Sequence, residues 1–286
     1  MLVGARLNNE AGHYSGAAYL ILGSATPSDR DLGAADAEYT GEDKDNYAGV
    51  SVASAGDTDG DGLADVLVGA SGYYGSGAAY LILGDGSPLS RSLSAADAKY
   101  TSAPDASGTG TSVATAGDFN GDGFADMLVG ASEYSAGASP DNWGVGAAYL
   151  ILGGPSAPDT VLDASAAQYT GEAAYDQAGT CVASAGDVDG DGFDDLLVGA
   201  PGSDAAGTWA GVAYMIQGAA APASRSLSEA DAKYYGESDA DFAGMSLAGA
   251  GDVNGDGPSD VLIGASGNDE AGSYAGATYL ILGSAF

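Results

Sequence analysis

Four copies of one nine-residue acidic segment divide this 286-residue chain into units of similar length. The copies begin at Asp57, Asp118, Asp187 and Asp252, so consecutive copies start 61, 69 and 65 residues apart. A period of this length indicates a repeat architecture, in which each unit buries its apolar surface against its neighbours. Any fold of this chain must therefore place the same acidic loop at the same point of each unit.

Within each copy, Asp or Asn occupies positions 1, 3, 5 and 9, and glycine occupies positions 4 and 6. Calcium takes about six to eight oxygen ligands, and a tight loop can offer alternate side chains together with the backbone carbonyl of position 7. Glycine permits the positive φ angles of such a turn. We therefore predict about four structural calcium sites per chain. The predicted ligands are Asp57, Asp59, Asp61, Leu63 and Asp65; Asp118, Asn120, Asp122, Phe124 and Asp126; Asp187, Asp189, Asp191, Phe193 and Asp195; and Asp252, Asn254, Asp256, Pro258 and Asp260.

The loops differ from an EF-hand, because the last acid stands at position 9 and the flanking residues are strand-like. Asp-Gly and Asn-Gly also form ordinary turns, which would explain one copy more easily than four. Neutral Asn120 and Asn254 replace an aspartate in the second and fourth loops, so we expect weaker binding there. Pro258 keeps the carbonyl oxygen that position 7 contributes.

The charge balance limits the partners of this chain. Forty acidic residues face seven Lys and Arg, for a net charge of −33, which disfavours nucleic acid and anionic membranes. A hydrophobic fraction of 45% argues against disorder. Clustered carboxylates repel one another without metal, so we expect folding to be linked to calcium.

Several site classes lack the residues that they need. His13 is the only histidine, which removes His-based triads, and the single Cys181 aligns with a serine in the other units, so it is expected to be a small buried strand residue. No apolar run approaches the length of a membrane span. Residues 1–5 do not resemble a signal peptide and look like a start inside a repeat. We expect an extracellular or cell-surface location.

Each unit contains four strand-like segments. Small residues precede the loop (49–55), an apolar run follows it (66–70), a third segment ends at Gly84, and a fourth centres on Tyr100. Four short strands per unit predict a β-propeller of antiparallel blades, with the calcium loop between the first and second strands. A linear stack of β units is the alternative. A calcium β-roll would show a nine-residue period throughout, which this chain does not.

The repeat boundaries divide one domain, 1–286, into about 4.5 units. They are a partial blade at 1–42, blades at 43–103, 104–172 and 173–238, and a partial blade at 239–286. The terminal strands would close a four- or five-bladed ring, or their open edges would pair with another copy. We expect closure or completion through oligomerisation.

The motifs around the loops resemble the FG-GAP repeat of integrin alpha-subunit propellers and their bacterial relatives. Phe242–Gly244 and Tyr47–Gly49 stand where Phe-Gly is expected, and Gly199–Pro201 is a full Gly-Ala-Pro. Gly-Ala-Ser replaces it in the other units, at residues 69–71, 130–132 and 264–266. The resemblance implies an antiparallel propeller, which in complete family members has seven blades, and a role in adhesion.

An aromatic residue recurs in the turn before the third strand of each unit, on the face opposite the calcium loops. The residues are Tyr14, Tyr74, Trp143, Trp209 and Tyr274, and the longest of these turns spans residues 133–145. Two interpretations remain open: the rings pack over the blade edges, or they form an aromatic, acidic rim that binds protein or glycan. The resemblance to integrins implies that this face binds a ligand, although in integrins a second subunit also contributes to binding.

Three functions are compatible with these residues. The first is a non-enzymatic, calcium-stabilised module for adhesion or recognition, for which no catalytic residue is predicted. The second is the propeller domain of a carbohydrate-active lyase or hydrolase, against which stand the lone histidine and the scarcity of basic residues. The third is a structural repeat fragment that self-assembles through open blade edges.

Overall fold

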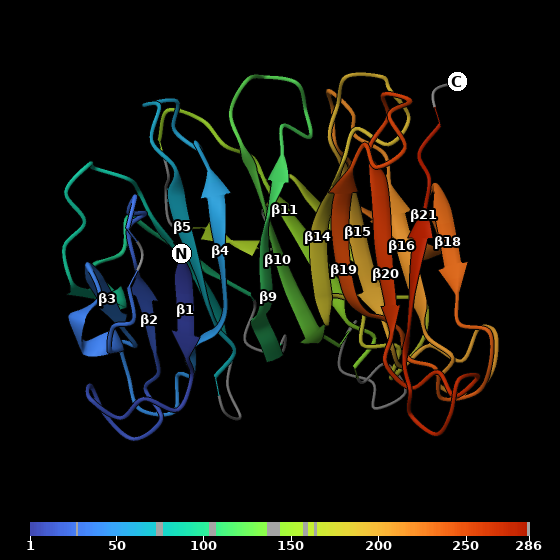
Figure 1. Ribbon diagram of the computed structural model, residues 1–286, viewed down its shortest axis with the longest axis horizontal. Coiled ribbons are helices and arrows are strands. Elements are labelled where there is room, and N and C mark those ends of the chain that lie inside the picture. The colour runs from blue at the N-terminus through green and yellow to red at the C-terminus, as the bar shows by residue number, and fades with distance from the viewer. Residues whose placement is uncertain are drawn as a thin grey trace.

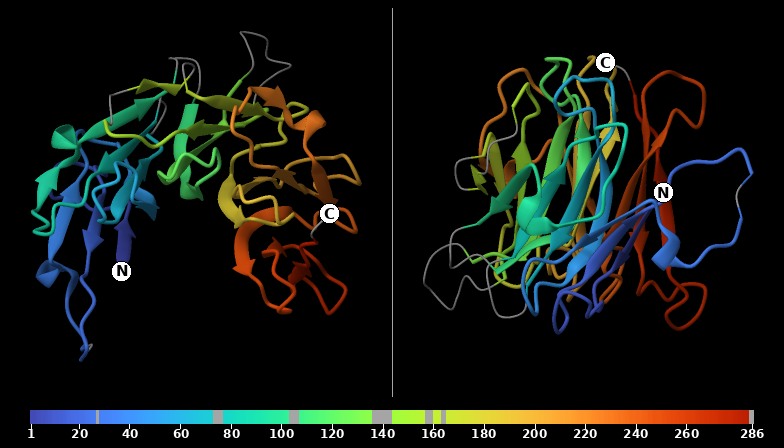
Figure 2. Two further views of the ribbon diagram at one scale, coloured as in Figure 1. Left: turned by 90° about the horizontal axis from the view of Figure 1, so that it is seen from above. Right: turned by 90° about the vertical axis from the view of Figure 1, so that its left-hand side faces the viewer.

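The computed structural model of the chain describes residues 1–26, 28–72, 77–102, 107–135, 144–156, 160–162 and 165–284. These residues form five β-sheets that stand side by side in an arc (Figures 1 and 2). The described ranges also contain the 3-10 turns η1 (Leu32–Ala34), η2 (Leu93–Ala95) and η5 (Leu227–Glu229). The all-β class and the propeller-like blades are as predicted. Nothing in these ranges forms a helix able to cross a membrane.

The sheets, named blades 1 to 5 in chain order, repeat one antiparallel strand order. Blade 1 contains β1 (Leu2–Ala5), β2 (Ala17–Leu20) and β3 (Ala37–Thr40). Blade 2 contains β4 (Ala48–Gly56), β5 (Asp65–Ala70), β6 (Ala78–Ile82) and β8 (Ala98–Thr101). Blade 3 contains β9 (Ser107–Gly117), β10 (Asp126–Glu133), β11 (Ala147–Ile151) and β13 (Ala167–Thr170). Blade 4 contains β14 (Cys181–Gly186), β15 (Asp195–Ala200), β16 (Val212–Ile216) and β18 (Ala232–Tyr235), and blade 5 contains β19 (Ala243–Gly251), β20 (Asp260–Ala265) and β21 (Ala277–Ile281).

Three further strands of two residues each join neighbouring blades. They are β7 (Arg91–Ser92), β12 (Thr160–Val161) and β17 (Arg225–Ser226). Each lies between the third and fourth strands of its own blade, but pairs in parallel with the outer strand of the preceding blade: β7 with β3, β12 with β8, and β17 with β13. Sequence analysis missed them, because two residues are too few to show a strand period.

The register of the inner strands agrees with the repeat alignment. Cys181 pairs with Gly199 as Ser51 pairs with Gly69, and Cys181 is half-buried. A Cβ on Gly69 would lie 2.2 Å from the carbonyl oxygen of Gly110 in the next blade. Glycine is therefore required there, because the backbones of adjacent blades approach more closely than a side chain allows.

Apolar contacts between neighbouring blades form the core. The middle strands β5, β6, β11 and β15 are buried along their whole length. Four separate clusters of buried side chains fill the four spaces between blades. Tyr149 of blade 3, for example, packs in one cluster with Leu81 of blade 2. The buried ring of Tyr80 keeps a polar partner, because its hydroxyl donates to Glu42 Oε1 (2.8 Å). Both faces of these middle strands are thus covered by neighbouring blades.

The arc does not close within this chain, so of the two expected outcomes a closed ring is not formed, and completion through oligomerisation stays a prediction. β1 and β21 belong to different sheets, and blades 1 and 5 stand at opposite ends of the arc (Figure 2). Leu280 in β21 is exposed, whereas its repeat equivalents Leu81 and Leu150 are fully buried.

The leucine of each 3-10 turn offers a test of blade stacking. Leu227 is buried between blades 3 and 4, whereas its repeat equivalent Leu32 is half-exposed in blade 1. We expect Leu227→Ala to lower the free energy of unfolding by about 2–5 kcal/mol, because it leaves a cavity. The matched Leu32→Ala should cost about 1 kcal/mol or less. Urea unfolding followed by circular dichroism measures both, and equal losses would contradict the stacking described.

Candidate metal centres and the aromatic face

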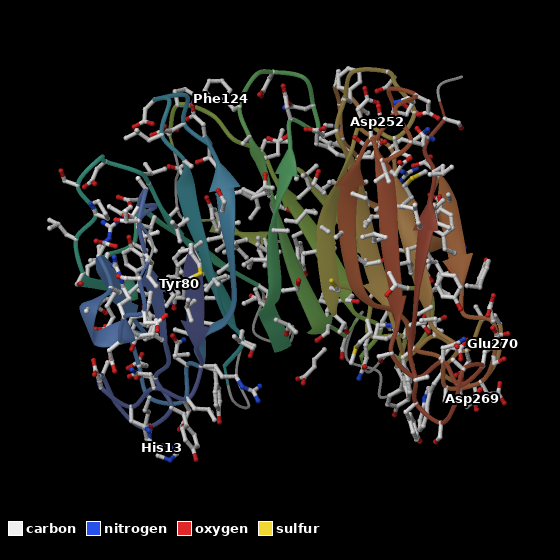
Figure 3. All side chains as sticks on the ribbon, viewed as in Figure 1. His13, Tyr80, Phe124, Asp252, Asp269 and Glu270 are labelled. Carbon is white, nitrogen blue, oxygen red and sulfur yellow. The ribbon has the colours of Figure 1, made fainter. Side chains whose placement is uncertain are left out.

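The four acidic loops lie at one end of the blades. They connect β4 to β5, β9 to β10, β14 to β15, and β19 to β20. Phe124 and Asp252, from two of these loops, lie at one end of the molecule, and His13, Asp269 and Glu270 from turns between second and third strands lie at the other (Figure 3). The molecule therefore has an acidic-loop face and an opposite face, as the order of the strands predicted.

The first aspartate of each loop holds the turn together. In the first loop, the amide N–H groups of Gly60 and Gly62 donate to the two carboxylate oxygens of Asp57, at 2.8 and 2.9 Å. Both glycines have positive φ, at 81° and 87°, which a Cβ would penalise. Asp187 and Asp252 accept equivalent bonds in their own loops. The loop is thus curled around its first carboxylate by its own backbone.

Carboxylate oxygens converge in two of the loops. One oxygen each from Asp57, Asp59 and Asp61 lie within 4.8 Å of one another, and the same holds for Asp187, Asp189 and Asp195. Hard oxygen donors at this mutual distance fit a calcium ion, since an oxygen that accepts one N–H bond keeps a second lone pair. Burial raises the pKa of Asp189, helped by the neighbouring carboxylates of Asp191 and Asp187.

The second and fourth loops are arranged differently. The side-chain amide of Asn120 donates to Asp122 Oδ2 (2.9 Å), and that of Asn254 donates to Asp256 Oδ2 (2.8 Å). The asparagine thereby satisfies one carboxylate oxygen that the aspartate of the other loops would leave to a cation. The loops form two classes, which follow the Asp or Asn at position 3.

The ninth aspartate of each loop is buried and tied to two parts of its blade. In the third loop, Asp195 Oδ2 accepts the N–H of Val188 (2.9 Å), and Oδ1 accepts the N–H of Gly218 (2.7 Å), the glycine that follows the third strand. The same pair of bonds recurs at Asp65, Asp126 and Asp260. Sequence analysis treated this aspartate as a metal ligand only. The recurring glycine after the third strand was the available signal of its second role.

Burial changes the protonation of these carboxyl groups. It raises the pKa of Asp126 to about 6 and that of Asp195 to about 6, although backbone hydrogen bonds from Gly153 and Gly218 oppose the shift. A buried carboxylate is poorly solvated, so its neutral form is favoured until a cation or further donors compensate.

Neighbouring acidic loops are joined through their backbones. The N–H of position 8 donates to the carbonyl of position 1 in the preceding loop: Ala125 to Asp57 (3.0 Å), Asp194 to Asp118 (3.2 Å) and Ser259 to Asp187 (2.7 Å). A second N–H, from the residue after the third-strand glycine, reaches the carbonyl of position 2: Gly154 to Thr58 (2.8 Å), Ala219 to Phe119 (3.0 Å) and Ser284 to Val188 (3.1 Å). The geometry of one loop therefore constrains the next.

On the opposite face, turn aromatics stack across blade boundaries. The rings of Tyr14 and Tyr47 have centroids 5.7 Å apart, and those of Trp209 and Phe242 are 6.2 Å apart, both stacked. Each pair joins a turn of one blade to the residues before the next inner strand, which supports the packing interpretation. Trp209 nevertheless remains 53% exposed, and Tyr274 is 78% exposed. Tyr74, Trp143 and most of the longest turn lie outside the described residues.

Comparison with known proteins identifies the repeat. The family model of the FG-GAP-like repeat matches residues 57–129, and that of the FG-GAP repeat matches residues 109–150, 182–214 and 243–281. The chain is similar to integrin alpha-PS5 of Drosophila melanogaster (34% identity over 178 residues, 58% of this chain and 16% of the relative). It is also similar to integrin alpha-5 of Xenopus laevis (33% over 239 residues, 81% and 21%) and to integrin alpha-V of Gallus gallus (32% over 240 residues, 80% and 21%).

The chain thus spans between 16% and 21% of the length of these relatives. The repeat units and the order of strands in each blade agree with the family that the sequence similarity indicates. The two repeat models together match more than half of the chain, which therefore belongs to the FG-GAP repeat family.

Proposed function

We propose that this chain is a non-enzymatic recognition module, stabilised by calcium and acting outside the cell or at its surface. The observation that carries the proposal is the chemical difference between the two ends of the blades. One end gathers carboxylates that converge within 4.8 Å, and the other presents half-exposed aromatic rings on a rigid scaffold. Loops on a rigid scaffold are the usual place for binding residues.

Calcium supplies positive charge to carboxylates that otherwise repel one another, in a chain whose net charge is −33. The residues that would hold it are the side chains at positions 1, 3, 5 and 9 and the carbonyl of position 7. Because position 1 also accepts a hydrogen bond from the next blade through its carbonyl, an ordered loop orders the contact between blades. The role is structural, and loops with Asp at position 3 bind more tightly than loops with Asn.

The ligand face is the end with the turn aromatics. Trp209 and Tyr274 offer large exposed rings, and acidic residues lie near both of them. Asp204 accepts the backbone N–H of Trp209 (2.7 Å), and Asp269 and Glu270 lie in the turn that carries Tyr274. Aromatic contacts flanked by carboxylates suit a protein ligand with exposed Lys or Arg side chains. A glycan that stacks on the same rings is the other ligand class that the face accommodates.

The number of bound ions tests the metal assignment. Native mass spectrometry in calcium should show four ions per chain, and EDTA should lower the melting temperature. Asp59→Ala should reduce the count by one, because it removes one of the three converging carboxylates in the first loop. Asp269→Ala, an exposed aspartate on the opposite face, is the matched control and should retain four. A metal-free chain with an unchanged melting temperature would refute the assignment.

Stability and calcium affinity should depend on pH in opposite directions. Without calcium, the folded protein keeps Asp126 and Asp195 protonated up to a pKa of about 6, above their ordinary value near 3.8, so it binds more protons than the unfolded chain between these limits. Its stability should therefore decrease as pH rises from 5 to 7.5. Calcium must displace those protons, so its affinity at these loops should increase about tenfold over the same interval.

Urea unfolding in EDTA measures the first slope, and competition with a chelating dye measures the second. If stability and calcium affinity changed with pH in the same direction, the roles assigned to Asp126 and Asp195 would be wrong.

Aromatic substitutions test the ligand face. The immobilised protein, in calcium, should retain ligands from a panel of extracellular-matrix proteins and glycans. Trp209→Ala and Tyr274→Ala should each weaken that binding about tenfold, as for contact residues at the centre of an interface. Leu282→Ala, at a residue as exposed as Trp209 but at the acidic-loop end of β21, should not. Turnover of a polysaccharide in calcium buffer would instead make the module part of an enzyme.

A further inference from the structure

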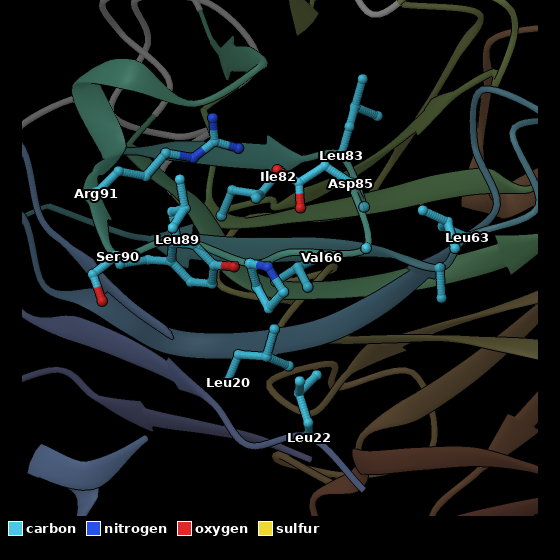
Figure 4. Close-up of a pocket in the computed structure, with 15 residues that line it drawn as sticks. Leu20, Leu22, Leu63, Val66, Ile82, Leu83, Asp85, Leu89, Ser90 and Arg91 are labelled. Carbon is cyan, nitrogen blue, oxygen red and sulfur yellow. The ribbon is translucent and has the colours of Figure 1, made fainter. Parts of the chain in front are cut away.

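One side chain at the end of the third strands departs from the repeat. Gln217 directly follows β16 in blade 4. The equivalent residue of the other units is leucine, at Leu22, Leu83, Leu152 and Leu282. The backbone is held alike in both cases. The N–H of Gln217 donates to Asp231 Oδ2 (2.9 Å), and in blade 2 the N–H of Leu83 (Figure 4) donates to the equivalent Asp97 Oδ2 (2.9 Å). The exchange of leucine for glutamine therefore changes a side chain on a conserved scaffold within the chain.

The side chain of Gln217 reaches the third acidic loop. Its Nε2 donates to Asp189 Oδ2, which belongs to the carboxylate at position 3 of that loop. The next residue, Gly218, donates its backbone N–H to Asp195 Oδ1 (2.7 Å), which belongs to the carboxylate at position 9. Two consecutive residues thus hold two carboxylates of one loop, one through a side chain and one through the backbone.

The first loop has the backbone contact without the side-chain contact. Gly84 donates to Asp65 Oδ1 (2.8 Å), as Gly218 does to its aspartate in the third loop. Leu83, which precedes Gly84, has no polar side-chain atom to offer to Asp59 at position 3. The two loops therefore share the bond that fixes position 9 and differ in the bond that fixes position 3.

The carboxylates of the two loops converge differently. In the first loop, the oxygens that lie within 4.8 Å of one another come from positions 1, 3 and 5, and Asp61 at position 5 is exposed. In the third loop they come from positions 1, 3 and 9, and Asp195 at position 9 is buried. The carboxylate at position 3 thus lies with an exposed partner in the loop that has leucine, and with a buried partner in the loop that has Gln217.

We infer that Gln217 is a positioning residue for the third acidic loop: its amide holds Asp189 beside Asp195, so that the loop offers calcium a preformed set of carboxylates. The inference rests on the proposed calcium role of these loops. An oxygen that accepts one hydrogen bond keeps a second lone pair for a cation. A hydrogen bond that fixes a metal ligand from outside typically contributes about ten- to hundredfold to the affinity. The third loop should therefore bind calcium more tightly than the first.

Each loop contains a backbone amide that reports its own occupancy. The glycine at position 6 donates its N–H to the first aspartate, which places Gly62 in the first loop and Gly192 in the third. Nuclear magnetic resonance of the full chain, labelled with ¹⁵N, follows both amides in one calcium titration. Half-saturation at Gly192 should need about tenfold less calcium than half-saturation at Gly62.

Variants separate the side chain of Gln217 from the rest of the loop. Gln217→Leu places the residue of the other units at this position, so it should fold, and it should raise the calcium needed at Gly192 about tenfold without changing Gly62. The reciprocal Leu83→Gln supplies the missing donor to the first loop and should lower the calcium needed at Gly62 by a similar factor. Gln177→Leu, at an exposed glutamine before β14, is the matched control and should change neither.

A measurement in EDTA tests the contact without calcium. The side-chain amide protons of Gln217 should exchange with solvent more slowly than those of exposed Gln177, because one of them is donated to Asp189. Equal exchange rates would overturn the inference. An unchanged melting temperature in EDTA confirms that Gln217→Leu is folded; if it falls, Leu83→Gln and the exchange rates still decide.

The outcomes also separate this inference from the proposed function. If both loop glycines respond to calcium but Gln217→Leu leaves Gly192 unchanged, the calcium sites stand and the role of Gln217 is wrong. If no loop glycine responds to calcium, the proposed calcium role is wrong and the inference fails with it.

Discussion

Close backbone contact between adjacent blades is the constraint on which the rest of this structure depends. It occurs where the glycine of each second strand meets the inner strand of the next blade, at Gly69, Gly130 and Gly199, each with a would-be Cβ about 2 Å from a carbonyl oxygen. A contact this short excludes any side chain and brings the flanking residues into van der Waals range. The fully buried tyrosines of the third strands, the small residues of the inner strands and the bonds between acidic loops all follow from it.

The repeating features were predictable because they have a residue pattern of their own. The strands around Tyr100 and Tyr169, the acidic loops and the opposite placement of the aromatic turns all follow from periodic sequence. Other features depend on contacts between blades, which no single unit reveals. The second role of Asp195, bonded to Gly218, needs two segments more than twenty residues apart, and the open arc is seen only when all five blades are placed in space.

The aromatic turns show why a pattern alone left two interpretations open. Recurrence at one position is expected both for a packing residue and for a binding residue. Stacking of Tyr14 on Tyr47 and of Trp209 on Phe242 shows packing, yet about half of the Trp209 side chain stays exposed. A ring held by its neighbour on one side loses little conformational entropy when a ligand covers the other side, so the two roles are compatible in one residue.

The two-residue strands β7, β12 and β17 have a mechanical consequence. Each fastens its own blade to the outer edge of the one before it, so an interior blade cannot leave the stack without breaking backbone bonds in two sheets. Tension applied along the arc would therefore be carried by these three short parallel pairs at the outer rim as well as by the loops at one end. A blade that lost its loop contacts would therefore stay attached at the outer rim until these pairs also broke, and the blades should detach one at a time.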